Sequence, residues 1–183
     1  LIVGIDHYEN VSPLFGCVND AYSIKSVLER NSDGTINFSS KLEVVTNSSS
    51  AISRKELKEL TKELFNDDSD VAIFYFSGHG YVEKTGGYLI TSECSDGDDG
   101  FPLTELLQIA NESKSRNKII ILDCCHAGFM GKDVGNTNTS TMSEGMTILT
   151  ASSETQYALE ENGSGVFTSL LVDALNGSAS NLV

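Results

Sequence analysis

The sequence has few basic residues. Its 183 residues include 12 Lys and Arg against 26 Asp and Glu, which gives a formal net charge of −14 at pH 7. A chain with this charge repels the phosphate backbone of nucleic acids, so we expect no nucleic acid among its partners. Two interpretations of the acidity stay open: it keeps the protein in solution, or it attracts cationic substrates to an acidic cleft.

Long apolar runs and targeting signals are also missing. No stretch is long or apolar enough to span a bilayer, and none resembles a signal peptide, so we expect no membrane contact. The four cysteines match no standard zinc framework and, without a secretory segment, indicate reduced thiols and a cytoplasmic location. The chain opens on the apolar run Leu1–Ile5 without a methionine, which indicates that further residues precede it.

What the sequence does contain is an alternation of strand-like and helix-like segments. Short apolar runs rich in β-branched residues are typical of buried parallel strands, and apolar residues at helical spacing indicate helices between them. Strands are predicted over residues 1–6, 41–46, 71–76, 119–123 and 146–151, with a short extended piece at 88–91. Helices are predicted over 20–30, after Ser53 (with Glu56 completing a capping box), from Pro102, and over 166–175 before Gly177. This order predicts a single α/β domain with a mostly parallel sheet of about five to six strands and helices on both faces.

Two of these strands are followed by residues suited to nucleophilic catalysis. The run 71–76 precedes Ser77-Gly78-His79-Gly80, and the run 119–122 precedes Asp123-Cys124-Cys125-His126-Ala127-Gly128. In an open α/β sheet, chemistry gathers beyond the carboxyl ends of the strands, and neighbouring strands lie roughly 4.8 Å apart. The imidazole of His79 and a thiol after the next strand can therefore face each other, as a cysteine nucleophile and its base require.

These motifs resemble those of the caspase–metacaspase clan of cysteine peptidases, and metacaspases and bacterial caspase-like proteins more than animal caspases. The likeness spans nearly the whole chain, because residues 16–21 (Gly-Cys-Val-Asn-Asp-Ala), 147–154 and 165–168 also resemble metacaspase segments. It implies a three-layer caspase-like fold over residues 1–183. The implied parts are a large-subunit-like part (1–130), a flexible linker loop (131–143) and a small-subunit-like part (144–183).

The resemblance also implies catalytic roles. Cys125 is the nucleophile, because it holds the third position of the family's Asp-x-Cys motif, and His79 is the general base and acid. The backbone N–H groups of Gly80 and Cys125 would form the oxyanion hole, where small residues let a peptide carbonyl approach closely. Cys124 is the rival nucleophile, and only one of the two cysteines can face His79 because adjacent side chains on an extended segment point to opposite sides.

Four further residues match the metacaspase pocket for the residue before the scissile bond: Asp20, Asp123, Ser77 and Cys17. Two carboxylates in a narrow cleft call for a Lys or Arg guest. Animal caspases accept aspartate through arginines, but the arginines of this chain lie away from the motifs. The alternative is structural: Asp20 caps a helix, and Asp123 accepts backbone N–H bonds at a strand end.

Cofactor and processing expectations come from the same comparison. Many metacaspases need calcium, but Leu103-Thr104 and Lys132 stand where calcium ligands are expected, so calcium activation is doubtful and we expect no cofactor. The acidic stretch 96–99 is better explained as a solvated turn than as a weak calcium site. Lys132 supplies a basic residue for self-cleavage in the linker loop.

The leading prediction is a cysteine endopeptidase that cleaves proteins or peptides after Arg or Lys, under the control of a regulatory domain or activating partner elsewhere. An inactive caspase-like interaction module is the first alternative, and the presence of both His79 and Cys125 argues against it. A metal-binding domain built from Cys124, Cys125, His126 and His79 is the second. Adjacent cysteines rarely chelate one ion well, and no Cys-x-x-Cys occurs in this sequence.

Overall fold

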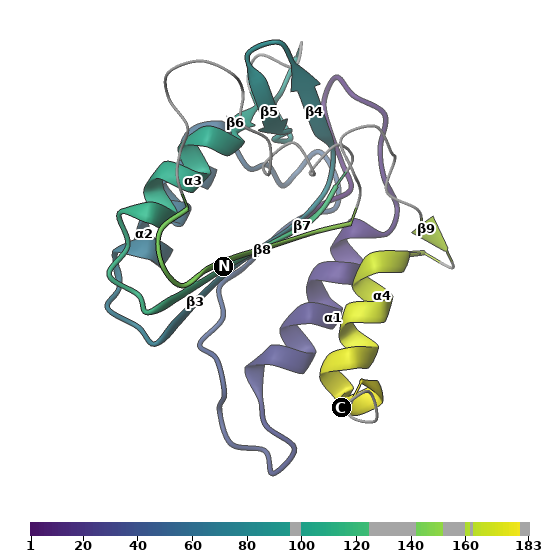
Figure 1. The fold of residues 1–183 in the computed structure, drawn as a ribbon. Coiled ribbons are helices and arrows are strands. Elements are labelled where there is room, and N and C mark those ends of the chain that lie inside the picture. The colour runs from purple at the N-terminus through teal and green to yellow at the C-terminus, as the bar shows by residue number, and fades with distance from the viewer. Residues whose placement is uncertain (96–99, 125–141, 152–159, 162, 180–183) are drawn as a thin grey trace.

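A computed structural model describes residues 1–95, 100–124, 142–151, 160–161 and 163–179. Its central sheet has five parallel strands in the order β2-β1-β3-β7-β8 (Figure 1). The strands are β1 (Ile2–Ile5), β2 (Leu42–Val45), β3 (Val71–Ser77), β7 (Asn117–Asp123) and β8 (Met146–Thr150). The predicted α/β fold with a parallel central sheet is therefore confirmed, and the described part of the chain supplies five strands to it.

Helices cover both faces of this sheet. The pair α1 (Cys17–Glu29) and α4 (Val166–Asp173) lies on one face, and the pair α2 (Arg54–Asn66) and α3 (Leu103–Asn111) lies on the other (Figure 1). Side chains alternate along β3, so Phe74 and Phe76 join the core under α2 and α3, whereas Tyr75 joins the core under α1 and α4. All three are fully buried. Burying each such side chain stabilises the fold by about 1.5–3 kcal/mol.

Helix starts show which caps are local and which are not. Ser53 caps α2 as predicted, with its Oγ accepting the Glu56 N–H at 3.1 Å. Helix α1 begins at Cys17 rather than at the predicted Asp20, because Asp6 at the end of β1 caps it from outside. The Asp6 Oδ1 accepts the N–H groups of Cys17 at 2.9 Å and Val18 at 3.4 Å. Helix α4 continues as a π-helical turn, Ala174–Ser178, in which Gly177 has φ +103°.

Two smaller sheets flank the carboxyl edge of the central one. The first is antiparallel and contains β4 (Gly80–Glu83), β5 (Gly86–Leu89) and β6 (Phe101–Pro102), and the second pairs β9 (Glu160–Glu161) with β10 (Ser164–Gly165). The sequence indicated only the extended piece at 88–91. Strand β4 follows His79 directly, so a β-hairpin begins at the predicted catalytic base. Gly86, at φ +146°, starts the returning strand.

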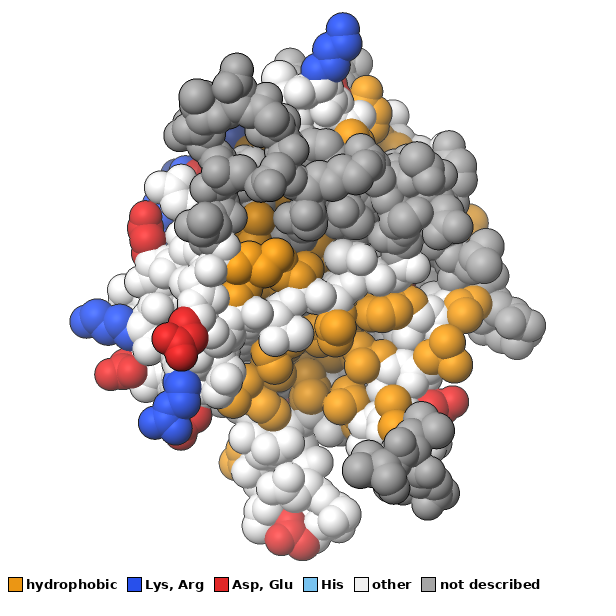
Figure 2. Space-filling view, viewed as in Figure 1, with side chains coloured by type: hydrophobic (Ala, Val, Ile, Leu, Met, Phe, Trp, Pro, Cys, Tyr) orange, Lys and Arg blue, Asp and Glu red, His pale blue; other side chains and the backbone are white. Residues whose placement is uncertain are grey.

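Strand β8 forms one edge of the central sheet within the described part of the chain. Figure 2 shows hydrophobic side chains gathered on the face of the molecule that carries this edge and α4. The exposed apolar side chains of this region are Met142, Leu149, Leu170 and Leu175.

Candidate active site

The predicted site residues gather where the central strands end. Ser77 and Asp123 are partners in the β3–β7 register, and the Gly78 N–H donates to the Asp123 carbonyl at 3.3 Å. Asp20 lies in the first turn of α1, which follows β1. Parallel pairing of β3 with β7 places His79 beyond the end of one strand and Cys124 beyond the end of the next. Cys125, His126 and Lys132 lie outside the described residues.

The loop between β1 and α1 holds His79. The main-chain N–H of His79 donates to the Tyr8 hydroxyl at 2.8 Å, and the two rings lie 4.8 Å apart between centroids. The Nε2 of His79 lies 2.8 Å from the Ser12 carbonyl oxygen. A carbonyl oxygen only accepts, so Nε2 carries the proton, and Nδ1 is the basic atom of the neutral ring. Sequence reasoning missed Tyr8 and Ser12, because no local pattern ties this loop to a histidine far along the chain.

Tyr8 is a buried support for the histidine. Its side chain is 4% exposed, and burial raises the pKa of its phenol well above the ordinary range, so the hydroxyl stays protonated. Gly78 is required beside it, because a Cβ at this position would lie 2.7 Å from the Tyr8 hydroxyl and 2.9 Å from the Phe76 ring. Gly80, the predicted oxyanion-hole residue, is half-buried at the start of β4.

Asp20 and Asp123 lie together beside the start of α4. Their side chains are 2% and 5% exposed. Asp20 accepts the Ser77 hydroxyl at 3.3 Å, the Ser164 hydroxyl, and the Gly165 N–H at 3.0 Å. Burial raises the pKa of Asp20, and these hydrogen bonds oppose the rise. The fold thus brings together three of the four predicted pocket residues.

Asp123 binds the first turn of α4. Its Oδ2 accepts the Thr168 hydroxyl at 2.6 Å and the Thr168 N–H at 3.3 Å. The structural alternative for Asp123, acceptance of a backbone N–H, is therefore observed, although the donor lies on a distant helix rather than in the local turn. Asp20 does not cap its own helix, because Asp6 binds the first N–H groups of α1. Asp20 instead accepts from Ser77 on β3 and from the N-cap residue of α4, Gly165.

Cys17, the fourth predicted pocket residue, is buried at the start of α1. Burial raises the pKa of the Asp6 carboxyl. The N–H and the thiol of Cys17 both hydrogen-bond this carboxyl and oppose the rise. Cys124, directly after β7, is buried as well.

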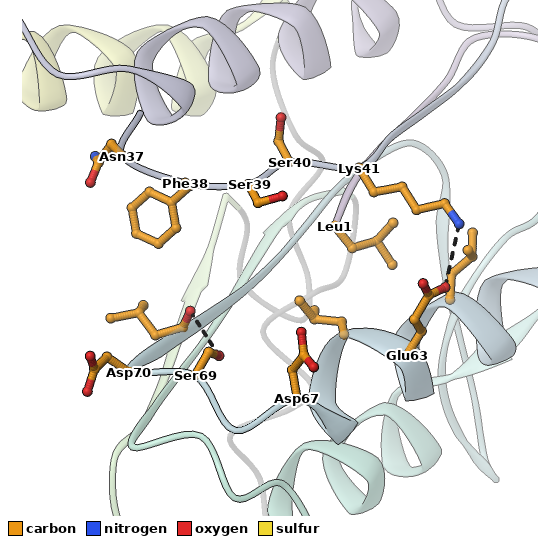
Figure 3. A pocket seen from close by; sticks show the side chains of 13 residues that line it. Leu1, Asn37, Phe38, Ser39, Ser40, Lys41, Glu63, Asp67, Ser69 and Asp70 are labelled. Carbon is orange, nitrogen blue, oxygen red and sulfur yellow. Dashed lines mark hydrogen bonds and ion pairs between the residues drawn. The ribbon is translucent and has the colours of Figure 1, made fainter. Parts of the chain in front are cut away.

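A cavity of about 560 Å³ lies at the other end of the strands and is no part of this site (Figure 3). Its lining includes Leu1, Phe38, Glu63 and Asp70, which lie near the amino ends of β1, β2 and β3. Among the described residues, no three His, Cys, Asp or Glu side chains are grouped in a way that could hold a metal ion. The helices in the same parts of the chain include none that is long and apolar enough to cross a membrane.

Comparison with known proteins shows which family the chain resembles. Among proteins with curated descriptions, none matches the chain in sequence. A similar solved structure is the crystal structure of caspase-1 from Spodoptera frugiperda, with a TM-score of 0.65 and 16% sequence identity. The match covers 96% of this chain and 67% of that one, and at such identity it demonstrates the fold alone. A family model described as the caspase domain matches residues 1–182. The chain therefore belongs to the caspase-domain family of cysteine peptidases, whose substrates are proteins.

Proposed function

We propose that this caspase-domain chain is an endopeptidase that hydrolyses peptide bonds after Arg or Lys through Cys125 and His79. The observation that carries the proposal is the convergence of two buried carboxylates, Asp20 and Asp123, on one spot beside the strand that leads to His79. A guest side chain that enters beside them exchanges water for negative charge, which favours a cation. An acidic guest would call for arginine, and the three arginines of the sequence bind elsewhere: Arg30 donates to the Gly34 carbonyl, and Arg54 and Arg116 form ion pairs with Glu105 and Asp70.

The proposed reaction begins with proton transfer from the Cys125 thiol to Nδ1 of His79. The thiolate then attacks the scissile carbonyl carbon, and the N–H groups of Gly80 and Cys125 stabilise the resulting oxyanion. The C–N bond breaks as His79 returns the proton to the leaving amine, which leaves a thioester. Water attacks the thioester while His79 takes its proton. The C–S bond then breaks, and the proton returns to the sulfur. The Ser12 carbonyl supports this role, because it holds the other ring nitrogen as the proton donor.

The proposed enzyme needs no calcium. The family resemblance places calcium ligands at the start of α3, where the only acid is Glu105. This carboxylate already forms ion pairs with Lys58 and with Arg54, the latter at 3.8 Å. Leu103 beside it is buried and carries no oxygen ligand in its side chain. We propose in addition that residues 1–130 and 144–183 correspond to the two subunits of the family, that Lys132 in the 131–143 loop is a self-cleavage site, and that a regulatory partner controls activity.

The experiment that tests the proposal is a peptide panel that varies only the residue before the scissile bond. Cleavage after Arg and Lys is expected, and the variant Cys125→Ala should be inactive while it stays folded. The matched control is Cys124→Ala, which removes the neighbouring thiol and should retain most of the activity. Activity that survives Cys125→Ala but not Cys124→Ala would reverse the assignment. A folded wild type that cleaves no peptide would favour the interaction-module alternative.

A further inference from the structure

The start of helix α4 is built against the two buried carboxylates. Gly165 is the N-cap residue, and its N–H lies 3.0 Å from both oxygens of Asp20. Thr168, in the first helical turn, donates its N–H to Asp123. A helix amino terminus carries partial positive charge, so both carboxylates receive electrostatic stabilisation that solvent would otherwise supply. The same two residues, Asp20 and Asp123, are the ones proposed to recognise the substrate cation.

A directed chain of hydroxyl groups completes the support of Asp123. The Thr168 Oγ1 lies 2.6 Å from the Asp123 carboxylate and 2.6 Å from the Tyr75 hydroxyl. A carboxylate only accepts, so Thr168 donates to Asp123 and in turn accepts from Tyr75. Burial raises the pKa of Tyr75 well above its ordinary range, so the Tyr75 hydroxyl keeps the proton that it donates to Thr168. Thr168 is itself 0% exposed, so water cannot replace its hydroxyl.

Close packing holds the two carboxylates near each other. A Cβ built on Gly165 would lie 2.3 Å from the Asp123 Oδ2 and 3.0 Å from the Asp20 Oδ2. The first separation is shorter than a real Cβ contact and the second is a tight one, so a residue other than glycine would push the Asp123 carboxylate or the helix aside. Gly165 therefore sets the distance of α4 from both acids, and Thr168 sets the orientation of one of them.

We propose that Gly165 and Thr168 are positioning residues for substrate specificity, which hold Asp20 and Asp123 ionised and aimed for an Arg or Lys side chain. The proposal rests on the proposed function, because it assigns these residues to the pocket of that peptidase. A buried carboxylate that loses its donors takes up a proton or turns away, and either change removes the charge that a guanidinium needs. The reacting groups at His79 and Cys125 should be unaffected, because neither bonds to Thr168 in the proposed mechanism.

The test uses Thr168→Val, which keeps the shape and the backbone N–H but removes the hydroxyl. The substrates are two peptides that differ only in arginine or neutral citrulline before the scissile bond. We expect kcat/KM for the arginine peptide to fall about tenfold, mainly through KM, because one charge-assisted hydrogen bond is lost. Cleavage of the citrulline peptide and alkylation of the enzyme by iodoacetamide should stay within about twofold of the wild type.

Two further variants separate this role from a general loss of packing. Thr168→Ser restores the hydroxyl and should recover most of the arginine preference. Thr61→Val is the matched control, because Thr61 is also 0% exposed and donates its hydroxyl to the Leu57 carbonyl at 2.7 Å, in α2 on the other face of the sheet. It should leave the ratio of arginine to citrulline cleavage unchanged. If Thr168→Val does not fold, Tyr75→Phe carries the test, with an expected fall in that ratio of about threefold.

The outcomes distinguish this inference from the proposed function. Suppose that the wild type prefers arginine and that Thr168→Val keeps this preference. That result overturns the positioning role and leaves the peptidase assignment intact. If Thr168→Val does not fold, the same result in Tyr75→Phe has the same meaning. An equal effect of Thr168→Val and Thr61→Val also overturns it. A wild type without any preference for arginine or lysine overturns the proposed specificity, and the inference with it.

Discussion

Asp123→Asn is the cleanest single change for testing the proposed pocket. Both hydrogen bonds from Thr168, at 2.6 and 3.3 Å, reach the same carboxylate oxygen, Oδ2. An asparagine can place its carbonyl oxygen at that position and keep both bonds. The variant therefore removes the charge of the carboxylate while it keeps both of these hydrogen bonds to α4.

The expected loss of activity follows from the value of the charge. Hydrogen bonds to charged groups contribute about 1.5–3 kcal/mol, and neutral ones about 0.5–1.5 kcal/mol. The difference is about 1–1.5 kcal/mol for each bond to the guest, which is close to tenfold in binding. One or two bonds to the guest thus predict a ten- to hundredfold fall in kcat/KM for arginine peptides, measured against the same peptides with citrulline.

Asp20→Asn provides an instructive contrast. Ser77 donates to one of its oxygens, Ser164 to the other, and the Gly165 N–H to both. An asparagine amide would have to face at least one of these donors, so the variant should lose about 1–3 kcal/mol of folding stability in addition to activity. The reasoning on Asp123 is refuted if Asp123→Asn cleaves after arginine as fast as the wild type. A gain of cleavage after aspartate in either variant would contradict it too, since no arginine is placed to receive that guest.

Four further predictions follow from the same site. Activity should persist in EGTA, and strict dependence on added calcium would show that carboxylates outside the described residues bind it. Mass spectrometry should find a cut after Lys132 in active enzyme and none in Cys125→Ala, whereas an intact loop in fully active protein removes the processing proposal. Burial raises the pKa of Asp20 above its ordinary value of 3.8, and the carboxylate is charged only above that raised pKa. The preference for arginine over citrulline should therefore decline as pH falls through it, and a preference that holds undiminished down to pH 3.8 would contradict this. Tyr8→Phe should lower kcat about tenfold with little change in KM, because the His79 N–H loses its acceptor at 2.8 Å, and an unchanged kcat would remove Tyr8 from the support of His79.

The sequence by itself determined the strands, the local caps and the motifs. The runs before Ser77 and Asp123 are short, apolar and rich in β-branched residues. These properties depend only on the local sequence, so both strands were predicted close to their observed bounds. Ser53 capped its helix as predicted, because an N-cap hydrogen bond spans only three residues. Apart from the extended piece at 88–91, the hairpin that begins at Gly80 was missed, because its strands, Gly-Tyr-Val-Glu and Gly-Gly-Tyr-Leu, are rich in glycine and contain no continuous apolar run.

Only the tertiary structure decided what surrounds the predicted site residues. Asp6 caps α1 from the end of β1, Ser12 fixes the proton on His79, and Thr168 binds Asp123 from a helix far along the chain. Each of these contacts joins residues that are distant in sequence, so no local pattern encodes it. The family motif pointed to Asp20 and Asp123 as a pair, but their burial and their donors depend on how α4 packs against the sheet. The chemistry of a carboxylate is set by its neighbours, and the fold supplies those neighbours.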